Sequence, residues 1–79
     1  GVRVLNTDKI VLYPNPVSDV LTLTSATAYQ VELISYDGSV VASGQLGGGE
    51  QLDVAAVSKG MYLVRFLGGE FKPRVILVN

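Results

Sequence analysis

The apolar residues of this chain recur at every second position, and this alternation limits the folds that the chain can adopt. Leu21 and Leu23 flank the polar Thr22, and residues 31–33 repeat the pattern as Val-Glu-Leu. A side-chain period of two is typical of a β-strand with one buried face. Because no window repeats apolar residues at the three- and four-residue spacing of an amphipathic helix, the sequence predicts an all-β protein.

Turn-forming residues at short intervals divide the alternating pattern into about seven strands. Asp37-Gly38 predicts a tight hairpin turn, Gly47–Gly49 predicts a break in the chain, and Gly68-Gly69 predicts a second hairpin. Between the glycine-rich break and the second hairpin, residues 55–59 connect the strand expected at 51–54 to the strand expected at 61–67. Residues 55–58 are the best candidate for one helical turn. Strands are expected at 9–13, 21–23, 31–33, 40–43, 51–54, 61–67 and 71–78, the last interrupted by Pro73 as at an edge or a bulge.

Short strands in a chain of 79 residues favour two packed sheets. A single open sheet would leave one apolar face in water, and so few strands cannot close a large barrel. With 48% hydrophobic and 16% charged residues, the chain can build one thin core without a metal or a disulfide. We therefore expect a small immunoglobulin-like antiparallel β-sandwich over residues 9–79, preceded by a flexible linker at 1–8.

Because no initiator Met and no signal peptide stand at its start, we expect the chain to be a fragment of a longer protein.

The composition disfavours several classes of function. A net charge of −1 with scattered charged residues provides no basic stripe for nucleic acid. The longest apolar run, residues 75–78, is far shorter than the roughly 20 residues of a membrane-spanning helix. The chain has no histidine and no cysteine, so the usual general base and thiol nucleophile are missing. We expect neither enzymatic activity nor a cofactor.

Several local patterns resemble sites but lack their chemistry. The glycines at 47–49 are not followed by the lysine and hydroxyl that a phosphate loop requires. Ser58 and Lys59 are adjacent, so in an extended chain their side chains point to opposite sides. The aspartates at 8, 19, 37 and 53 are too widely spaced for a calcium loop. These patterns predict turns and solvated surface.

The aromatic residues allow a structural and a functional interpretation. Tyr13, Tyr29, Tyr36 and Phe71 could form a sugar-stacking platform, but scattered aromatics in a small β protein usually fill the core or cover its edge. Tyr62 follows the crossing segment and resembles a tyrosine corner, in which the ring enters the core and the hydroxyl bonds upstream backbone. A glycine at position 60 would let the backbone pass close beside that ring.

The stretch "YPNPVSDVLTL" places two prolines around one asparagine before an alternating strand. Pro14 and Pro16 fix their own φ angles and donate no ladder hydrogen bond, so the preceding strand must stop there. The side chain of Asn15 is expected to cap the resulting turn, with Ser18 or Asp19 acting similarly before the next strand. The segment predicts a rigid corner between the two sheets.

Four segments of the chain resemble, in order, the type A C-terminal sorting domains of the bacterial type IX secretion system. They are "KIVLYPNPVSDVLTL", "VELISYDGSVV", "LDVAAVSKGMYLVRF" and "KPRVILV". Together they cover residues 9 to the end of the chain. The family's final strand often carries lysines near its end, whereas here the basic residues are Lys72 and Arg74 and the last residue is Asn79.

The resemblance implies a non-catalytic export signal at the C-terminus of a larger passenger protein. It implies delivery through the periplasm and recognition by the secretion machinery with its outer-membrane translocon. It also implies cleavage by a sortase-like protease near residues 1–8. The passenger would then reach the cell surface or the medium of a Gram-negative bacterium. The last strand, 71–78, is the expected docking edge, polarised by its basic residues and protected from self-pairing by Pro73. Weak dimerisation of the chain through an edge strand stays open. The recognition and structural residues are Tyr13, Pro14, Asn15, Pro16, Gly38, Gly60, Tyr62, Lys72 and Arg74.

A second interpretation stays open at this point. The same fold would suit an immunoglobulin-like accessory module of a surface enzyme, which spaces a catalytic domain or binds carbohydrate. The missing tryptophan and the absence of a clustered aromatic pair in the sequence disfavour carbohydrate binding.

Overall fold

A computed structural model describes residues 10–68 and 71–79, and every regular element in these ranges is a β-strand. The expected linker at 1–8, residue 9 and the second glycine of the predicted 68–69 turn lie outside the described residues. The all-β prediction is confirmed. The strands are β1 (Leu12–Tyr13), β2 (Val20–Leu23), β3 (Tyr29–Ile34), β4 (Val40–Leu46), β5 (Leu52–Asp53), β6 (Gly60–Phe66) and β7 (Arg74–Val78).

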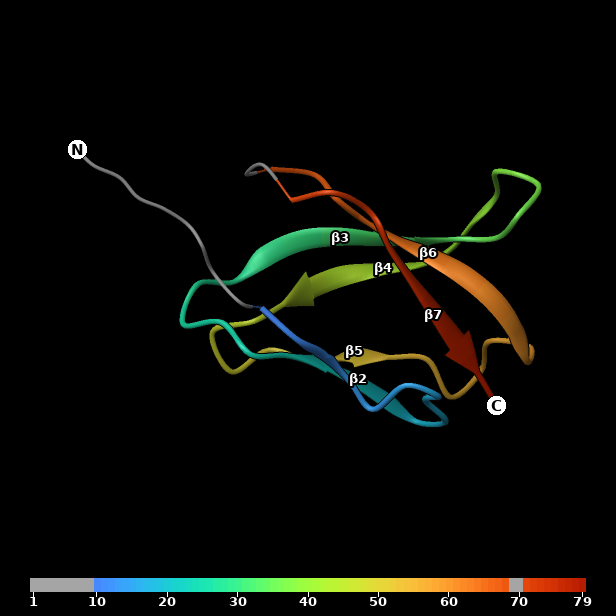
Figure 1. The fold of residues 1–79 in the computed structure, drawn as a ribbon, viewed down its shortest axis with the longest axis horizontal. Helices are drawn as coiled ribbons and strands as arrows, with labels where there is room; N and C mark the ends of the chain where they lie inside the picture. Colours follow the sequence, from blue (N-terminus) through green and yellow to red (C-terminus); the bar gives the residue numbers. More distant parts are fainter. Residues whose placement is uncertain (1–9, 69–70) are drawn as a thin grey trace.

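The strands form two antiparallel sheets that pack as a sandwich (Figure 1). One sheet has the order β1-β2-β5, and the other has the order β4-β3-β6-β7. The chain passes between the sheets at the β2–β3, β4–β5 and β5–β6 connections. The proline-rich segment instead joins β1 to β2 within the smaller sheet, so the prediction that it forms a corner between the two sheets is wrong. β4 and β7 are therefore the edge strands of the larger sheet, as expected for the last strand.

The core lies between the sheets and is built from alternate residues of the strands. Leu21 and Leu23 are buried while the intervening Thr22 is half-buried, and β3 repeats this pattern, so the predicted facing of both strands is confirmed. Each fully buried aliphatic side chain contributes roughly 1.5 to 3 kcal/mol through burial. The buried residues are Ile10, Val17, Leu21, Leu23, Val31, Leu33, Leu46, Leu52, Val54, Val64, Phe66, Ile76 and Val78.

Two local predictions require correction. Residues 55–58 contain no helical turn. The N–H of Val57 donates to the carbonyl of Val54 at 3.0 Å, which closes one isolated hydrogen-bonded turn over residues 54–57. The last strand begins at Arg74 and not at residue 71, so Pro73 precedes the strand and does not interrupt it. The reason is that proline offers no N–H to a ladder.

The glycine-rich break is a tight turn packed against the β2–β3 loop. The N–H of Gly47 donates to the carbonyl of Glu50 at 3.1 Å, and the N–H of Glu50 donates back at 2.9 Å. Gly47 has a φ of 94°, and a Cβ there would lie 2.3 Å from the carbonyl oxygen of Thr27. Gly49 has a φ of 90°, but a Cβ there would meet nothing within 4 Å.

Replacing Gly47 by alanine is expected to lower the free energy of unfolding by about 2 to 3 kcal/mol, because it combines a strained φ with a backbone clash. Gly49→Ala is the matched control, since it carries only the φ strain and should cost about 1 kcal/mol. Urea denaturation of both variants measures the difference. Equal losses would contradict the close approach at position 47.

Candidate recognition site

The segment between β1 and β2 lies along the outer edge of β7. The N–H of Val17 donates to the carbonyl of Leu77 at 2.8 Å, and the N–H of Asn79 donates to the carbonyl of Val17 at 2.8 Å. These bonds form a parallel bridge between Val17 and Val78. The side chain of Val17 is fully buried. A loop of the smaller sheet is thus hydrogen-bonded to the edge of the larger one, which ties the two layers together.

Asn15 extends this contact by one further hydrogen bond. The N–H of Leu77 donates to Oδ1 of Asn15 at 2.9 Å. The prediction that Asn15 caps its own turn is therefore wrong, because its side chain reaches the last strand. The N–H of Leu77 faces away from β6, since adjacent residues of an antiparallel strand direct their backbone groups to opposite sides. Without Asn15, this donor would be left to solvent.

The prolines and the tyrosine of the same segment are exposed. Strand β1 ends at Tyr13, as the prolines predict, and both the Tyr13–Pro14 and Asn15–Pro16 peptide bonds are cis. Tyr13 pairs with Thr22 and leaves about half of its surface exposed (47%). Pro14 and Pro16 are exposed as well. The segment therefore presents two proline rings and one tyrosine ring to solvent, while Asn15 and Val17 bind it to β7.

This contact changes the expected docking edge. Half of the outer edge of β7 is already occupied, because both backbone groups of Leu77 are bonded. By alternation, the remaining outward groups are the carbonyl of Pro73 and the N–H and carbonyl of Val75. The edge that the sequence predicts as open is short and is covered at its C-terminal half.

Asn15→Ala is expected to lower the free energy of unfolding by about 1 kcal/mol and to speed hydrogen exchange of the Leu77 amide. Thr24→Val is a matched control, because Oγ1 of Thr24 accepts a hydrogen bond from the N–H of Val11 at 2.9 Å, away from β7. Residue-resolved hydrogen exchange by NMR measures both variants. Unchanged protection of Leu77 in Asn15→Ala would contradict this contact.

The two basic residues at the last strand do not act as a pair on its edge. Arg74 lies on the same face of β7 as the buried Ile76, is half-buried, and donates from Nη1 to the carbonyl of Ile10 at 3.4 Å. Lys72 precedes the strand and is exposed. Alternation explains the difference, because it turns Arg74 towards the space between the sheets. Arg74 therefore holds the start of the described chain against β7.

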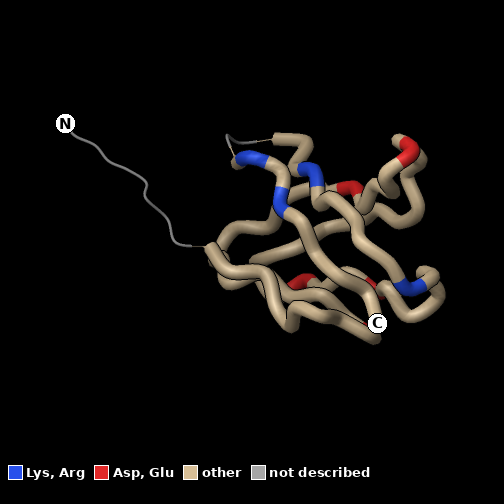
Figure 2. The backbone as a smooth tube through the Cα atoms, turned by 45° about the vertical axis from the view of Figure 1, so that its right-hand side comes forward, with Lys and Arg blue, Asp and Glu red and all other residues tan. Residues whose placement is uncertain are grey.

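The described cations all belong to β6, β7 or their flanks (Figure 2). Arg65 makes a 2.5 Å ion pair with Glu32 on the neighbouring strand. Lys59 directly precedes β6, at the end of the strand pair opposite Arg74. The charge on this side of the molecule is therefore spread along the strand pair.

Tyr62 adopts the predicted corner. Its hydroxyl donates to the carbonyl of Ser58 at 2.6 Å, and its ring is half-buried against the core. Gly60 has a φ of 153°, a conformation that other residues rarely adopt. A Cβ at position 60 would lie 3.6 Å from the Tyr62 ring, an ordinary contact. Glycine is therefore required here by the backbone conformation. The expected close approach of the backbone to the Tyr62 ring does not require it, because a Cβ would fit.

Gly38 lies in the β3–β4 hairpin turn with a φ of 92°, as a turn glycine should. Asp37 organises this turn by accepting hydrogen bonds at Oδ1 from the hydroxyl of Ser35 and from the N–H of Ser39. The Ser35 hydroxyl, followed by the Ser39 N–H, lowers the pKa of the Asp37 carboxyl below its usual value of 3.8. These hydrogen bonds therefore favour the ionised form of the carboxyl group.

The structure brings several distant sequence landmarks together in one line. Gly60 pairs with Val78, and Val78 in turn is bridged by Val17. The glycine before the corner tyrosine, the last strand and the proline-rich segment are therefore neighbours, whereas Gly38 is not among them. Sequence reasoning missed the roles of Val17 and Leu77. The only signal for Val17 was its place as the first apolar residue after the second proline.

The aromatic residues do not form a sugar-stacking platform within the described part of the chain. Tyr29, Phe66 and Phe71 pack together, with ring centroids 5.0 to 6.2 Å apart. Tyr29 and Phe71 rest against the core, as expected. Tyr36, by contrast, is 97% exposed, so the expectation that it covers the core is wrong.

Within residues 10–68 and 71–79, no group of three or more acidic, histidine or cysteine residues is placed to hold a metal ion. None of the described residues forms a helix that could cross a membrane.

Comparison with known proteins identifies the family. A family model described as "Secretion system C-terminal sorting domain" matches residues 11–76, which include the proline-rich segment, the corner tyrosine and most of β7. No curated protein and no solved structure matches the chain. The match covers well over half of the chain, and it gives no support to an accessory or carbohydrate-binding module. The chain therefore belongs to the secretion-system C-terminal sorting domains, which are C-terminal signals for type IX secretion.

Proposed function

We propose that this domain is read as a folded unit that carries a passenger, joined on its N-terminal side, through the periplasm and the outer-membrane translocon. Membership of the family supports export by the type IX machinery to the cell surface or the medium. The role that we assign to the domain is that of the signal. The machinery then has to distinguish this fold from other periplasmic proteins.

The observation that carries this proposal is the junction of Asn15 and Val17 with β7. Three hydrogen bonds of 2.8 to 2.9 Å fix the proline-rich segment on the last strand. Because the two segments lie at opposite ends of the described chain, only the folded domain presents them together. A linear motif read in an unfolded chain would need no such junction.

The candidate residues divide into two groups under this proposal. Exposed residues contact the machinery directly, whereas the others hold the junction, the adjoining corner and, in the case of Gly38, the separate β3–β4 turn in shape. The first group contains Tyr13, Pro14, Pro16 and Lys72, and the second contains Asn15, Gly38, Gly60, Tyr62 and Arg74.

A sortase-like protease then separates the passenger from the signal at the cell surface. The expected cleavage region, residues 1–8, lies outside the described residues. The resemblance of the chain to the family supports this step.

The test is a fusion of residues 1–79 behind a fluorescent protein that carries a periplasmic export signal. We expect fluorescence at the cell surface or in the medium of a type IX-competent strain and in the periplasm of a secretion-null strain. Mass spectrometry of the exported protein is expected to place its new C-terminus before residue 9. Periplasmic retention in both strains would contradict the export role, and an intact exported fusion would contradict the cleavage step.

A further inference from the structure

The outer face of the larger sheet carries aliphatic side chains that the fold itself does not bury. The cross-strand register places Val40, Ile34, Leu63 and Val75 side by side, in a row that crosses β4, β3, β6 and β7. The neighbouring row holds Met61 opposite Leu77. We call these six residues the aliphatic face.

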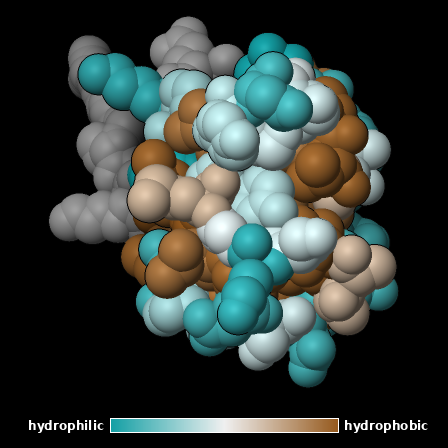
Figure 3. Space-filling view, turned by 90° about the vertical axis from the view of Figure 1, so that its right-hand side faces the viewer, coloured by the Kyte–Doolittle hydropathy of each residue, from teal (hydrophilic) through white to brown (hydrophobic). Residues whose placement is uncertain are grey.

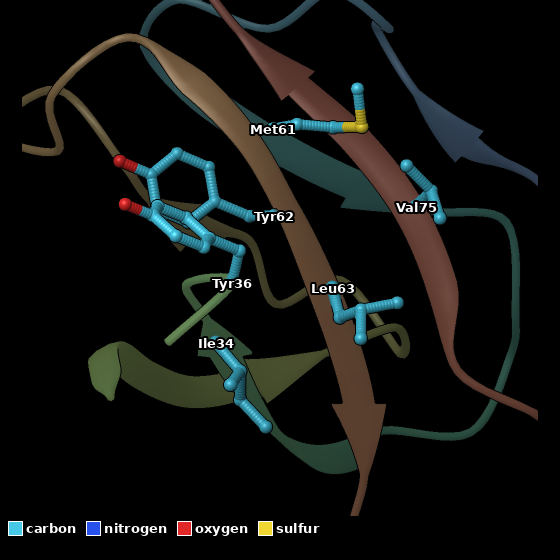
Figure 4. A pocket seen from close by; sticks show the side chains of 6 residues that line it. All are labelled: Ile34, Tyr36, Met61, Tyr62, Leu63 and Val75. Carbon is cyan, nitrogen blue, oxygen red and sulfur yellow. The ribbon is translucent and has the colours of Figure 1, made fainter. Parts of the chain in front are cut away.

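The side chains of the aliphatic face are accessible. Met61 is 64% exposed, and Val75 is 57% exposed although it neighbours the buried Ile76 in its strand. Val40, Leu63 and Leu77 expose 40 to 49% of their surface. Figure 4 shows how the labelled side chains lie over β3, β6 and β7, and hydrophobic groups reach the surface in the view of Figure 3. A sandwich needs only its inner faces apolar, so this outer row requires another explanation.

The face is also hollowed. A cavity of about 140 Å³ is lined by Ile34, Met61, Leu63 and Val75 from the face, together with the two tyrosines at positions 36 and 62. Tyr36, almost wholly exposed, stands at its margin. A shallow apolar hollow with a tyrosine at its rim has the form of a site that accepts an inserted side chain.

The size of the face limits its occupant. Strands about 4.8 Å apart, with outward residues repeating every 6.8 Å or so, give six residues a footprint of roughly 200 Å². A stable interface buries about 800 Å² on each partner. The face alone is too small to hold two copies of the chain together, but it matches one extended segment laid across the strands.

The charges around the face favour an uncharged occupant. The row beside it is formed by Glu32 and Arg65, which neutralise one another at 2.5 Å. At the other end, the exposed Lys59 and the carboxylate of Asp37, in the turn after Tyr36, carry opposite charges. A border balanced in this way neither attracts an anionic lipid surface nor favours a highly charged peptide.

From these observations, we propose that the aliphatic face docks an extended, uncharged apolar segment of the export machinery, one of whose side chains enters the hollow. The inference rests on the proposed export function and adds a second contact surface to it. Leu77 joins the two surfaces, because its backbone is bonded to Asn15 and Val17 while its side chain belongs to the face.

The test replaces three of the four residues in the first row by threonine, which is nearly isosteric with valine and shorter than leucine. The triple variant Val40→Thr, Leu63→Thr and Val75→Thr keeps β-forming side chains but makes the row polar. Its control is Val11→Thr with Val20→Thr, which alters exposed valines outside the larger sheet. Each variant is placed in the fluorescent fusion, and export is compared with melting temperature.

We expect the triple variant to melt close to the unmodified chain and to be exported about tenfold less, because apolar burial at the contact is lost. The control should be exported normally. Undiminished export of the folded triple variant would overturn the proposal. Should the triple variant not fold, the single Val75→Thr, nearly isosteric and at an exposed site, is measured in its place with the same criterion.

Two other occupants are tested on the isolated 79-residue chain. A dimer in light scattering that the triple variant converts to monomer would overturn the proposal in favour of a second copy. Flotation with phosphatidylcholine–phosphatidylglycerol vesicles that the triple variant abolishes would overturn it in favour of a membrane. Failure of the export function itself looks different, since the unmodified fusion would then stay in the periplasm.

Discussion

A chain truncated before Arg74 is expected not to fold. The deletion removes Ile76 and Val78, which are 1% and 2% exposed, and uncovers the edge of β6 along its whole pairing with β7. Burial of the two side chains alone is worth roughly 3 to 6 kcal/mol. At about 0.05 to 0.15 kcal/mol per residue, this is comparable with the total stability of so small a domain.

Circular dichroism during heating measures this prediction. The truncated chain should show no cooperative transition, whereas removal of Asn79 alone, which loses the bond to Val17, should leave a folded domain. A truncated chain with a sharp transition near that of the full chain would contradict the account. Loss of export on removal of the last strand therefore reports folding, and only folded variants can identify recognition residues.

Tyr62→Ala is expected to lower the free energy of unfolding by about 3 to 4 kcal/mol. The change removes a half-buried ring from the core and the hydrogen bond from its hydroxyl to Ser58. Tyr62→Phe separates the two contributions, because it keeps the ring and should cost about 1 kcal/mol.

Urea denaturation of both variants provides the comparison. If Tyr62→Ala and Tyr62→Phe were destabilised equally, the ring would contribute nothing and the corner would depend on its hydroxyl alone. A Tyr62→Ala domain as stable as the unmodified chain would remove the structural role of the corner altogether.

The sequence predicted the features that depend on neighbouring residues. The alternation around Leu21 and Leu23, the hairpin at Gly38 and the end of β1 at the prolines all follow from local propensity. The hydroxyl bond of Tyr62 was also predicted, because it spans only four residues. In each case the determining residues are close in the chain.

The features that the sequence did not predict join distant residues. Asn15 and Leu77 are 62 positions apart, and an asparagine between two prolines has good local reasons to cap its own turn. The bond from Arg74 to the carbonyl of Ile10 joins residues 64 positions apart, which no local pattern predicts. The aliphatic face was not predicted, because the strand pattern alone does not distinguish an exposed valine from a buried one.

The most direct test of the folded signal compares export of the Asn15→Ala and Thr24→Val fusions. Each variant removes one side-chain acceptor from a backbone N–H at 2.9 Å, so both should lose about 1 kcal/mol of stability and remain folded. Only Asn15→Ala loosens the proline-rich segment from β7. We expect its export to fall well below that of Thr24→Val, and equal export of the two folded variants would contradict the claim that the machinery reads this junction.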